Sequence, residues 1–217
     1  MEIGMKYIGK LIETFNSPSF PVFTINDVKL LFTGTSMTDG YLHLMMHNLL
    51  KKRKITRITR GVYTFHNNEA LVAGFAFSPF YFGLEHALRI HKFSLQVTNP
   101  LVITSRNVRN GVKHFSGRNY VVYKLPAKYL FGYALKNYAD MWIPVSDIEK
   151  TVIDMIYFKI AIRDEIWPKL LKEINTQKLK NYLKNYNPRF RSKVINIIAI
   201  SKARNIANIR ELEKSRV

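Results

Sequence analysis

The sequence of 217 residues contains no cysteine. Disulfides, iron–sulfur clusters and thiolate zinc sites are therefore excluded, which fits a reducing compartment. A long hydrophobic run is also lacking: the longest uncharged stretch, residues 70–84, is interrupted by two glycines, a serine and a proline. A membrane-spanning helix needs about twenty apolar residues, and the first residues do not have the pattern of a signal peptide. We therefore expect a soluble, cytoplasmic protein without membrane contact.

Acidic residues are few. Asp and Glu number 15 against 34 Lys and Arg, which gives a net charge of +19 and an isoelectric point near 10.1. Nine basic and four acidic residues lie in 1–66, eleven and six in 67–160, and fourteen and five in 161–217, for net charges of +5, +5 and +9. A surface this positive indicates a polyanionic partner, of which double-stranded DNA is the first candidate. A hydrophobic fraction of 47% supplies a packed core.

The common catalytic signatures are absent. The sequence has no glycine-rich phosphate loop, no Gly-x-Ser-x-Gly elbow and no zinc-deaminase motif. The acidic residues that a metal-dependent nuclease would need have no recognisable spacing. His43 and His47 stand four residues apart, but no third metal ligand accompanies them. We predict no catalytic residue, no metal site and no cofactor, and hence a protein that is not an enzyme.

The fold class that we predict is α+β, with a winged helix-turn-helix in residues 1–66. Apolar residues at helical spacing from Tyr7 to Phe15 indicate a first helix. Thr24 is a suitable N-cap for a second helix, and the Ser36–Asp39 spacing of a capping box opens a third that reaches about Lys52. Residues 54–58 and 62–65 then have the pattern of two short strands. Three helices followed by a β-ribbon are typical of a winged helix-turn-helix.

The third helix has two distinct faces. Leu42, Met45, Met46 and Leu49 cluster on the core side, and polar residues occupy the other. In a helix-turn-helix the second helix of the motif enters the major groove, and basic residues at its end and in the wing contact phosphates. The DNA-binding residues that we predict are Ser36, Gly40, Tyr41, His43, His47, Asn48, Lys51, Lys52, Arg53, Arg57 and Arg60. A winged helix used for protein contacts is the alternative, and Gly40 either permits close approach of a partner or belongs to a loose first turn.

Residues 67–160 have the pattern of a mixed α/β domain. Strands are predicted at 101–105, 120–124 and 142–145, and helices at 84–91 and 146–158. The stretch from Arg106 to Arg118 is rich in basic residues and asparagine, which indicates either anion contacts or a solvated hairpin. Residues 161–217 form a basic helical extension, with one helix capped by Thr176 and a last helix whose apolar stripe runs from Val194 to Leu212 and packs on the second domain or on another subunit.

Residues 20–160 resemble a known family. The basic stretch followed by a strand and Arg60-Gly61-Val62-Tyr63 is similar to the N-terminal domain of the AbiEi-type antitoxins of type IV toxin–antitoxin systems. Residues 81–88 with His91 look like the helix that follows the linker in that family, and residues 99–104 look like its first strand. Residues 146–154, with Glu149-Lys150 followed by Asp154, resemble its helix motif.

The resemblance implies a DNA-binding antitoxin that represses its own operon and counteracts a nucleotidyltransferase-like toxin of the AbiEii type. Its operator would be the protein's own promoter, with an inverted repeat that a homodimer would match. Two alternatives stay open: a stand-alone winged-helix transcriptional regulator without a toxin, and a protein-binding adaptor.

Overall fold

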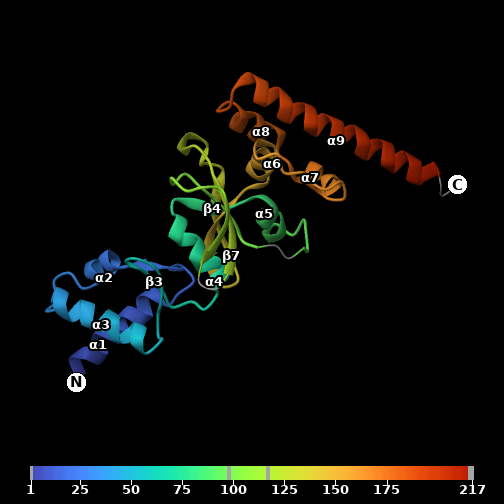
Figure 1. Cartoon of the computed structure of the whole chain (residues 1–217). Coiled ribbons are helices and arrows are strands. Elements are labelled where there is room, and N and C mark those ends of the chain that lie inside the picture. Colours follow the sequence, from blue (N-terminus) through green and yellow to red (C-terminus); the bar gives the residue numbers. More distant parts are fainter. Residues whose placement is uncertain (1, 97–98, 116–117, 215–217) are drawn as a thin grey trace.

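The computed structural model describes residues 2–96, 99–115 and 118–214. Figure 1 shows the N-terminal helices with a small sheet at one end of the molecule, a larger sheet in the middle and the C-terminal helices at the other end. The two ends of the chain lie far apart, and the last helix extends away from the body. The mixture of helices and sheets agrees with the α+β class.

Residues 2–65 form three helices around a small core. They are α1 (Glu2–Phe15), α2 (Ile25–Leu31) and α3 (Asp39–Lys51). The strands β1 (Phe23–Thr24), β3 (Val62–Thr64) and β2 (Thr56–Thr59) pair in that order as an antiparallel sheet. Thr24 is the N-cap of α2, as predicted, and it forms a capping box with Asp27. The predicted core face of α3 is buried throughout, against Leu11, Phe15 and Phe23.

The predicted start of α3 was wrong. Its N-cap is Thr38, whose hydroxyl accepts a hydrogen bond from the Tyr41 N–H at 3.3 Å. Ser36 lies before the helix, and its hydroxyl is hydrogen-bonded to that of Tyr7 at 2.9 Å. Ser, Thr and Asp are comparable as N-caps, so the run of such residues here allowed more than one starting point.

The larger sheet is mixed. Among the described residues its strand order is β6-β7-β5-β4-β9-β8, with β4 (Phe80–Phe82) parallel to β9 (Met141–Ser146) and β5 (Leu101–Thr104) parallel to β7 (Arg118–Lys124). The edges are β6 (Gly111–Phe115) and β8 (Tyr133–Tyr138), each paired antiparallel with its neighbour. The strands predicted at 101–105, 120–124 and 142–145 are β5, β7 and β9. Phe80–Phe82 is a strand, so within residues 81–88 only the part from Leu84 onward is helical.

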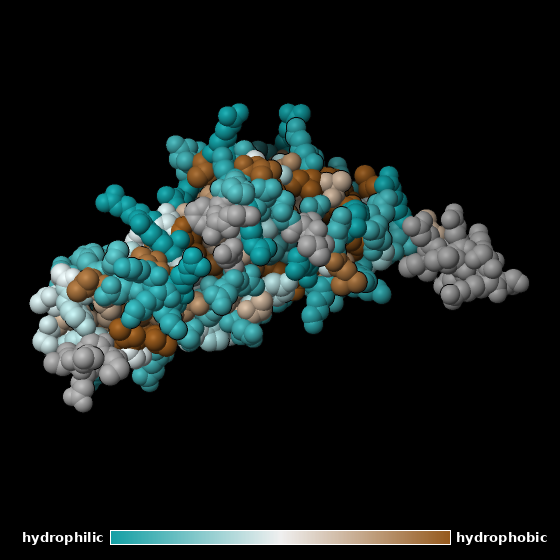
Figure 2. Space-filling view, turned by 60° about the horizontal axis from the view of Figure 1, so that its bottom comes forward, coloured by the Kyte–Doolittle hydropathy of each residue, from teal (hydrophilic) through white to brown (hydrophobic). Residues whose placement is uncertain are grey.

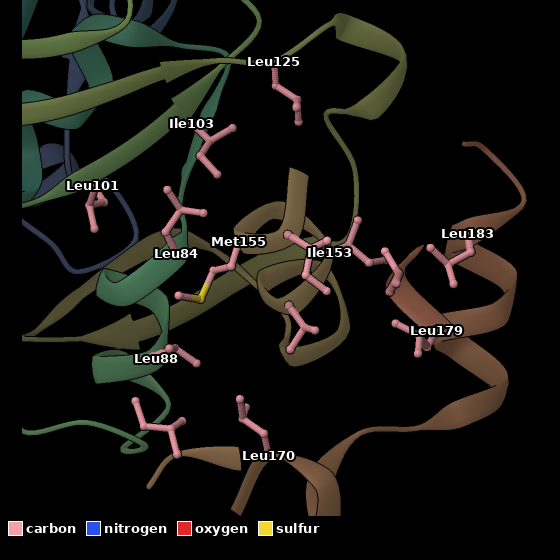
Figure 3. Close-up of a cluster of buried hydrophobic side chains, with 14 of the residues drawn as sticks. Leu84, Leu88, Leu101, Ile103, Leu125, Ile153, Met155, Leu170, Leu179 and Leu183 are labelled. Carbon is pink, nitrogen blue, oxygen red and sulfur yellow. The ribbon is translucent and has the colours of Figure 1, made fainter. Parts of the chain in front are cut away.

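Helix α5 (Leu84–Ile90) lies between two hydrophobic clusters. Leu84 and Leu88 belong to a cluster with α6 (Ile148–Tyr157), whereas Ala87 and Ile90 belong to another with Phe82 and Val102 of the sheet. Figure 3 shows α6 in the middle of the first cluster, with Leu84 and Leu88 on one side of it and Leu179 and Leu183 on the other. Because α5 has apolar neighbours on both sides, nearly every position along it is buried.

The C-terminal helices are α7 (Trp167–Glu173), α8 (Thr176–Leu183) and α9 (Pro188–Lys214). The N-cap of α8 is Asn175, whose side chain accepts the Lys178 N–H, and not the predicted Thr176. Val194 is buried, but Ile200 and Ile206 are exposed. The apolar stripe of α9 therefore packs only in its first part. The side chains of Ile209 and Leu212 fall outside those that the structure describes.

The small N-terminal core and the larger sheet are joined through the hairpin. Ile58 of β2 is buried in the same cluster as Phe80 and Phe82, with Leu71 and Val72 of α4 (Glu69–Val72) beside them. The N–H of Trp142 in β9 also donates to the carbonyl oxygen of Pro18, at 2.9 Å. Residues on both sides of the expected boundary at 66–70 thus share one packed cluster.

The face of the molecule turned toward the viewer in Figure 2 is largely hydrophilic. On the face shown in Figure 2, hydrophilic residues predominate along the length of the molecule, and hydrophobic residues occur as separate patches. Within the described ranges, none of the helices combines the length and the apolar character needed to cross a membrane.

Candidate nucleic-acid interface

The outer face of α3 is exposed to solvent. We use this name for six residues of which none is buried: Gly40, Tyr41, His43, Leu44, His47 and Asn48. Five of them are predicted DNA-binding residues, and Leu44 is 55% exposed. The structure therefore places the predicted residues of the helix together on one accessible surface, opposite the buried face that fixes the helix to the core.

The first turn of α3 is held by an ion pair. Lys29 of α2 donates to the Asp39 carboxylate at 2.8 Å, and this hydrogen bond and charge lower the pKa of Asp39. Asp39 also lies in the first turn, where a carboxylate interacts favourably with the helix dipole. The pair holds α2 and α3 together and neutralises the acidic group nearest the outer face. Sequence reasoning missed Lys29, since an ion pair between two helices has no fixed spacing in a sequence.

Gly40 leaves space beside the helix. A Cβ added at this position would meet no heavy atom of the described chain within 4 Å, and the backbone is helical. No packing contact inside the protein accounts for the glycine. Glycine costs an exposed helix about 1 kcal/mol relative to alanine, and the open space remains accessible to a partner.

The C-terminal end of α3 is a Schellman motif. The Arg53 N–H donates to the Leu50 carbonyl and the Lys54 N–H to the Leu49 carbonyl, each at 2.9 Å. Arg53 itself has a φ of 52°, in the left-handed region that favours glycine. This conformation costs a non-glycine residue about 1 kcal/mol. The chain therefore carries an arginine where glycine would be more stable.

A basic surface follows α3. We give this name to the exposed side chains of Lys51, Lys52, Arg53, Lys54, Arg57 and Arg60. Among the described residues, these side chains form no ion pair, and the single hydrogen bond among them joins Arg57 Nε to the Thr59 carbonyl at 3.3 Å. The sequence contains no Asp or Glu between Asp39 and Glu69. The residues of the outer face of α3 and of the basic surface thus lie in one continuous stretch of the sequence that contains no acidic residue.

The hairpin presents the last two arginines. Arg57 and Arg60 flank an irregular turn, in which the register shifts between Arg57 and Thr59 and Gly61 has a φ of 77°. On the opposite side of β2, Ile58 is buried. Because side chains alternate along a strand, this burial fixes Arg57 on the solvent side.

Part of the basic stretch from Arg106 to Arg118 is held by contacts within the protein, whereas Arg109 is exposed. Arg106 donates to the carbonyl of Ala76, and Lys124 is held by Asn107 at 2.7 Å. The Asn110 side chain accepts the backbone N–H of Lys124 at 2.6 Å. These contacts hold the turn before β6 in place.

The Glu149-Lys150 motif lies in the interior. Lys150 and Asp154 are fully buried and form an ion pair one turn apart. Tyr81 donates to the second oxygen of Asp154 at 2.6 Å, and Lys150 donates to the Tyr186 hydroxyl at 3.3 Å. Burial lowers the pKa of Lys150 and raises that of Asp154, while each partner opposes the shift of the other. We call Tyr81, Lys150, Asp154 and Tyr186 the buried polar cluster.

Glu149 has separate partners. Its carboxylate accepts the Asn175 N–H at 2.7 Å and lies 3.2 Å from Lys178 Nζ, which also lies 3.0 Å from Asp147. Asp147 is the N-cap of α6. Glu149 and Lys150 therefore do not pair with each other, and both serve to join α6 to α8 and the segment after it.

Groups of acidic or histidine side chains that could hold a metal ion do not occur among the described residues. His43 and His47 remain two exposed residues on the outer face of α3.

No protein-family model and no curated protein matches this sequence. Among solved structures, the chain is similar to the RV2827C protein from Mycobacterium tuberculosis. The similarity covers 90% of this chain and 77% of that chain, with a TM-score of 0.54 and 11% sequence identity. At this identity the likeness concerns the fold alone.

Proposed function

We propose that this protein is a DNA-binding transcriptional regulator whose first 66 residues form a winged helix-turn-helix domain. In this proposal α2 and α3 are the helix-turn-helix, and the β2–β3 hairpin is the wing. The observation that carries the proposal is the basic surface: six exposed cations without an ion pair among the described residues, directly beside the accessible outer face of α3. Cations in such an arrangement bind the phosphates of DNA and release counterions.

The two surfaces have different tasks in this proposal. The outer face of α3 enters the major groove, where Asn48 and the histidines contact base edges. Asparagine pairs with adenine through two hydrogen bonds. The basic surface binds the backbone on either side and fixes the position of the helix without reading sequence. The Lys29–Asp39 ion pair keeps the single acidic group at the start of α3 from repelling phosphate.

The antitoxin role is the further part of the proposal. It is supported by the resemblance of residues 20–160 to AbiEi-type antitoxins. We propose that the protein represses its own operon and counteracts a nucleotidyltransferase-like toxin encoded beside it. The proposed arrangement of the remaining chain is a second domain at 67–160 and a basic extension at 161–217.

The DNA-binding proposal is tested by fluorescence anisotropy with a duplex from the region upstream of the gene and with a scrambled duplex. We expect tighter binding to the upstream duplex, with protection centred on an inverted repeat in a footprinting experiment. Asn48→Ala should reduce the preference for the upstream duplex by about 1–3 kcal/mol and leave the affinity for the scrambled duplex unchanged. The matched control is Asn196→Ala, which removes an exposed asparagine of α9.

Equal affinity of the unchanged protein for both duplexes would contradict sequence-specific regulation. Co-purification with a protein partner, together with no DNA binding at all, would instead favour the adaptor. The antitoxin role is tested by co-expression with the neighbouring gene: growth restored by this protein supports it. Binding to the operator without any effect on toxicity would leave the stand-alone regulator.

A further inference from the structure

A cavity of about 780 Å³ lies beside α5, away from the outer face of α3. Its walls come from the segment around α4, from α5, from the residues before β5, from the start of β7 and from the end of β8. Cavities of this size accommodate small organic molecules. The polar residues of the wall that matter here are Asn68, His86, Arg89, Asn99, Arg118 and Asn119.

His86 is the most unusual of these residues. Its side chain is only 3% exposed, and neither ring nitrogen has a hydrogen-bond partner in the part of the chain that the structure describes. The ring packs against Phe82, with 5.0 Å between the centroids. Buried polar groups are nearly always hydrogen-bonded, because an unpaired one costs free energy. An apolar side chain would fill the same position without that cost.

The imidazole of His86 is neutral near pH 7. Burial lowers the pKa of His86 to about 4, and the charge of Arg89 contributes to the decrease. A neutral imidazole has one N–H donor and one acceptor nitrogen. The position therefore suits a ligand with an uncharged polar group, such as a hydroxyl or an amide, that can both accept and donate.

The remaining wall contains two guanidinium groups. Arg89 and Arg118 both line the cavity, and its described lining contains no Asp or Glu. The Arg89 guanidinium is oriented by the Tyr138 hydroxyl, at 3.3 Å. Guanidinium groups bind carboxylates and phosphates through two parallel hydrogen bonds. Asn68, Asn99 and Asn119 add amide groups that both donate and accept.

We propose that this cavity binds a small organic anion, with its carboxylate or phosphate on Arg89 and Arg118 and a neutral hydroxyl or amide on His86. The ligand would also contact Asn68 and Leu71, in the segment that leaves the β2–β3 hairpin. The inference is independent of DNA binding, because no residue of α3 or of the basic surface lines the cavity.

The binding test uses the full chain labelled with 15N in its histidines. The ring resonances of His86 are assigned by their loss in His86→Leu. The protein is then titrated with adenosine monophosphate, with citrate and with inorganic phosphate. We expect a saturable shift of the His86 resonances with at least one of the two organic anions, at lower concentration than with inorganic phosphate. Arg89→Gln and Arg118→Gln should abolish it, whereas Arg109→Gln, an exposed arginine outside the cavity, should not.

Three outcomes of this titration would overturn the proposal. The first is the absence of a shift with all three probes, and the second is a shift that persists in both arginine variants. The third is a shift caused by a blunt DNA duplex and by neither organic anion, since the cavity would then serve a nucleic-acid phosphate.

A second measurement is independent of the choice of probe. In buffer without organic anions or phosphate, His86→Leu should raise the melting temperature by about 2–4 °C, because leucine replaces an unpaired polar group at similar volume. A decrease of that size would show that His86 serves packing alone, and would contradict the assignment.

Discussion

Some basic residues toward the C-terminal end of the molecule have partners within the protein, whereas those of the basic surface form no ion pair among the described residues. In the basic surface, six cations face solvent without an ion pair among the described residues. Toward the other end, Lys150 of α6 is buried against Asp154, Lys178 of α8 bridges Asp147 and Glu149, and Arg191 of α9 donates to two backbone carbonyls. Other cations there, such as Lys180 and Lys184, are exposed. The C-terminal segment has the larger net charge, +9 against +5. Net charge alone therefore does not identify the surface that is free to bind a polyanion.

The largest effect on the free energy of unfolding is expected for a substitution in the buried polar cluster. Removal of one partner leaves an uncompensated buried charge, so Lys150→Met should lower the free energy of unfolding by about 3–5 kcal/mol. The double variant Lys150→Met with Asp154→Leu should recover most of that loss, because no isolated charge remains. Urea denaturation measures the free energy of unfolding of the single and the double variant. If Lys150→Met lowers the free energy of unfolding by less than about 1 kcal/mol, the Lys150 charge does not stabilise the fold. Lys150 would then not differ in this respect from the exposed cations of the basic surface.

The salt dependence of DNA binding allows a direct comparison of the basic residues at the two ends of the molecule. Arg57→Ala with Arg60→Ala should reduce the slope of log affinity against log salt by about 1.8, since each phosphate contact contributes about 0.9. The control is Lys180→Ala with Lys184→Ala, which removes the same charge from exposed positions in α8 and at its C-cap. Its slope should stay unchanged. Equal decreases in the two double variants would show that both ends contact DNA.

Substitution of Arg53 at the end of α3 is expected to change protein stability and DNA affinity in opposite directions. Arg53→Gly should raise the free energy of unfolding by about 1 kcal/mol, because glycine adopts the left-handed conformation without strain, and should weaken DNA binding. Lys159 has the same conformation after α6, with a φ of 58° and the same pair of backbone hydrogen bonds. Lys159→Gly should stabilise the protein similarly and leave DNA affinity unchanged. Thermal denaturation and anisotropy give the two values, and unchanged affinity in Arg53→Gly would remove this residue from the interface.

The smallest effect on the free energy of unfolding is expected for substitution of Lys178. Its side chain is 41% exposed, so the bridge to Asp147 and Glu149 is screened by solvent. We expect Lys178→Met to lower the free energy of unfolding by about 0.5–1 kcal/mol and to have no effect on DNA binding. Lys184→Met, at an exposed position of the same region, should cost less. If the two variants are indistinguishable in urea denaturation, the bridge contributes nothing measurable.

Local patterns predicted the N-terminal helices well. The Thr24 cap and the buried face of α3 depend on neighbours within a few residues, and both are confirmed. The start of α3 was missed because Ser36 and Thr38 are similar as caps, and only the tertiary contact of Ser36 with Tyr7 distinguishes them. The strand β1 has two residues, too few for any periodicity.

Features that depend on packing could not be predicted. The strand β4 lies within an apolar run that also contains α4, and its three residues are all buried, so no alternation marks it. His86 is a polar residue in a helix with apolar neighbours on both sides, and the sequence gives no indication that its ring nitrogens would be buried. Likewise, the local sequence does not indicate that Lys150 is buried, because Tyr186, which accepts its hydrogen bond, lies 36 residues further along the chain.

The position of Ile58 has a consequence for protein engineering. One side of β2 carries Arg57, while Ile58 on the other side is buried among Phe80 and Phe82 of the larger sheet. A chimera that takes only residues 1–66 would expose this apolar contact and lose the bond from Trp142 to Pro18. Transplanting the hairpin into another regulator therefore requires its apolar support as well, or a polar replacement at position 58.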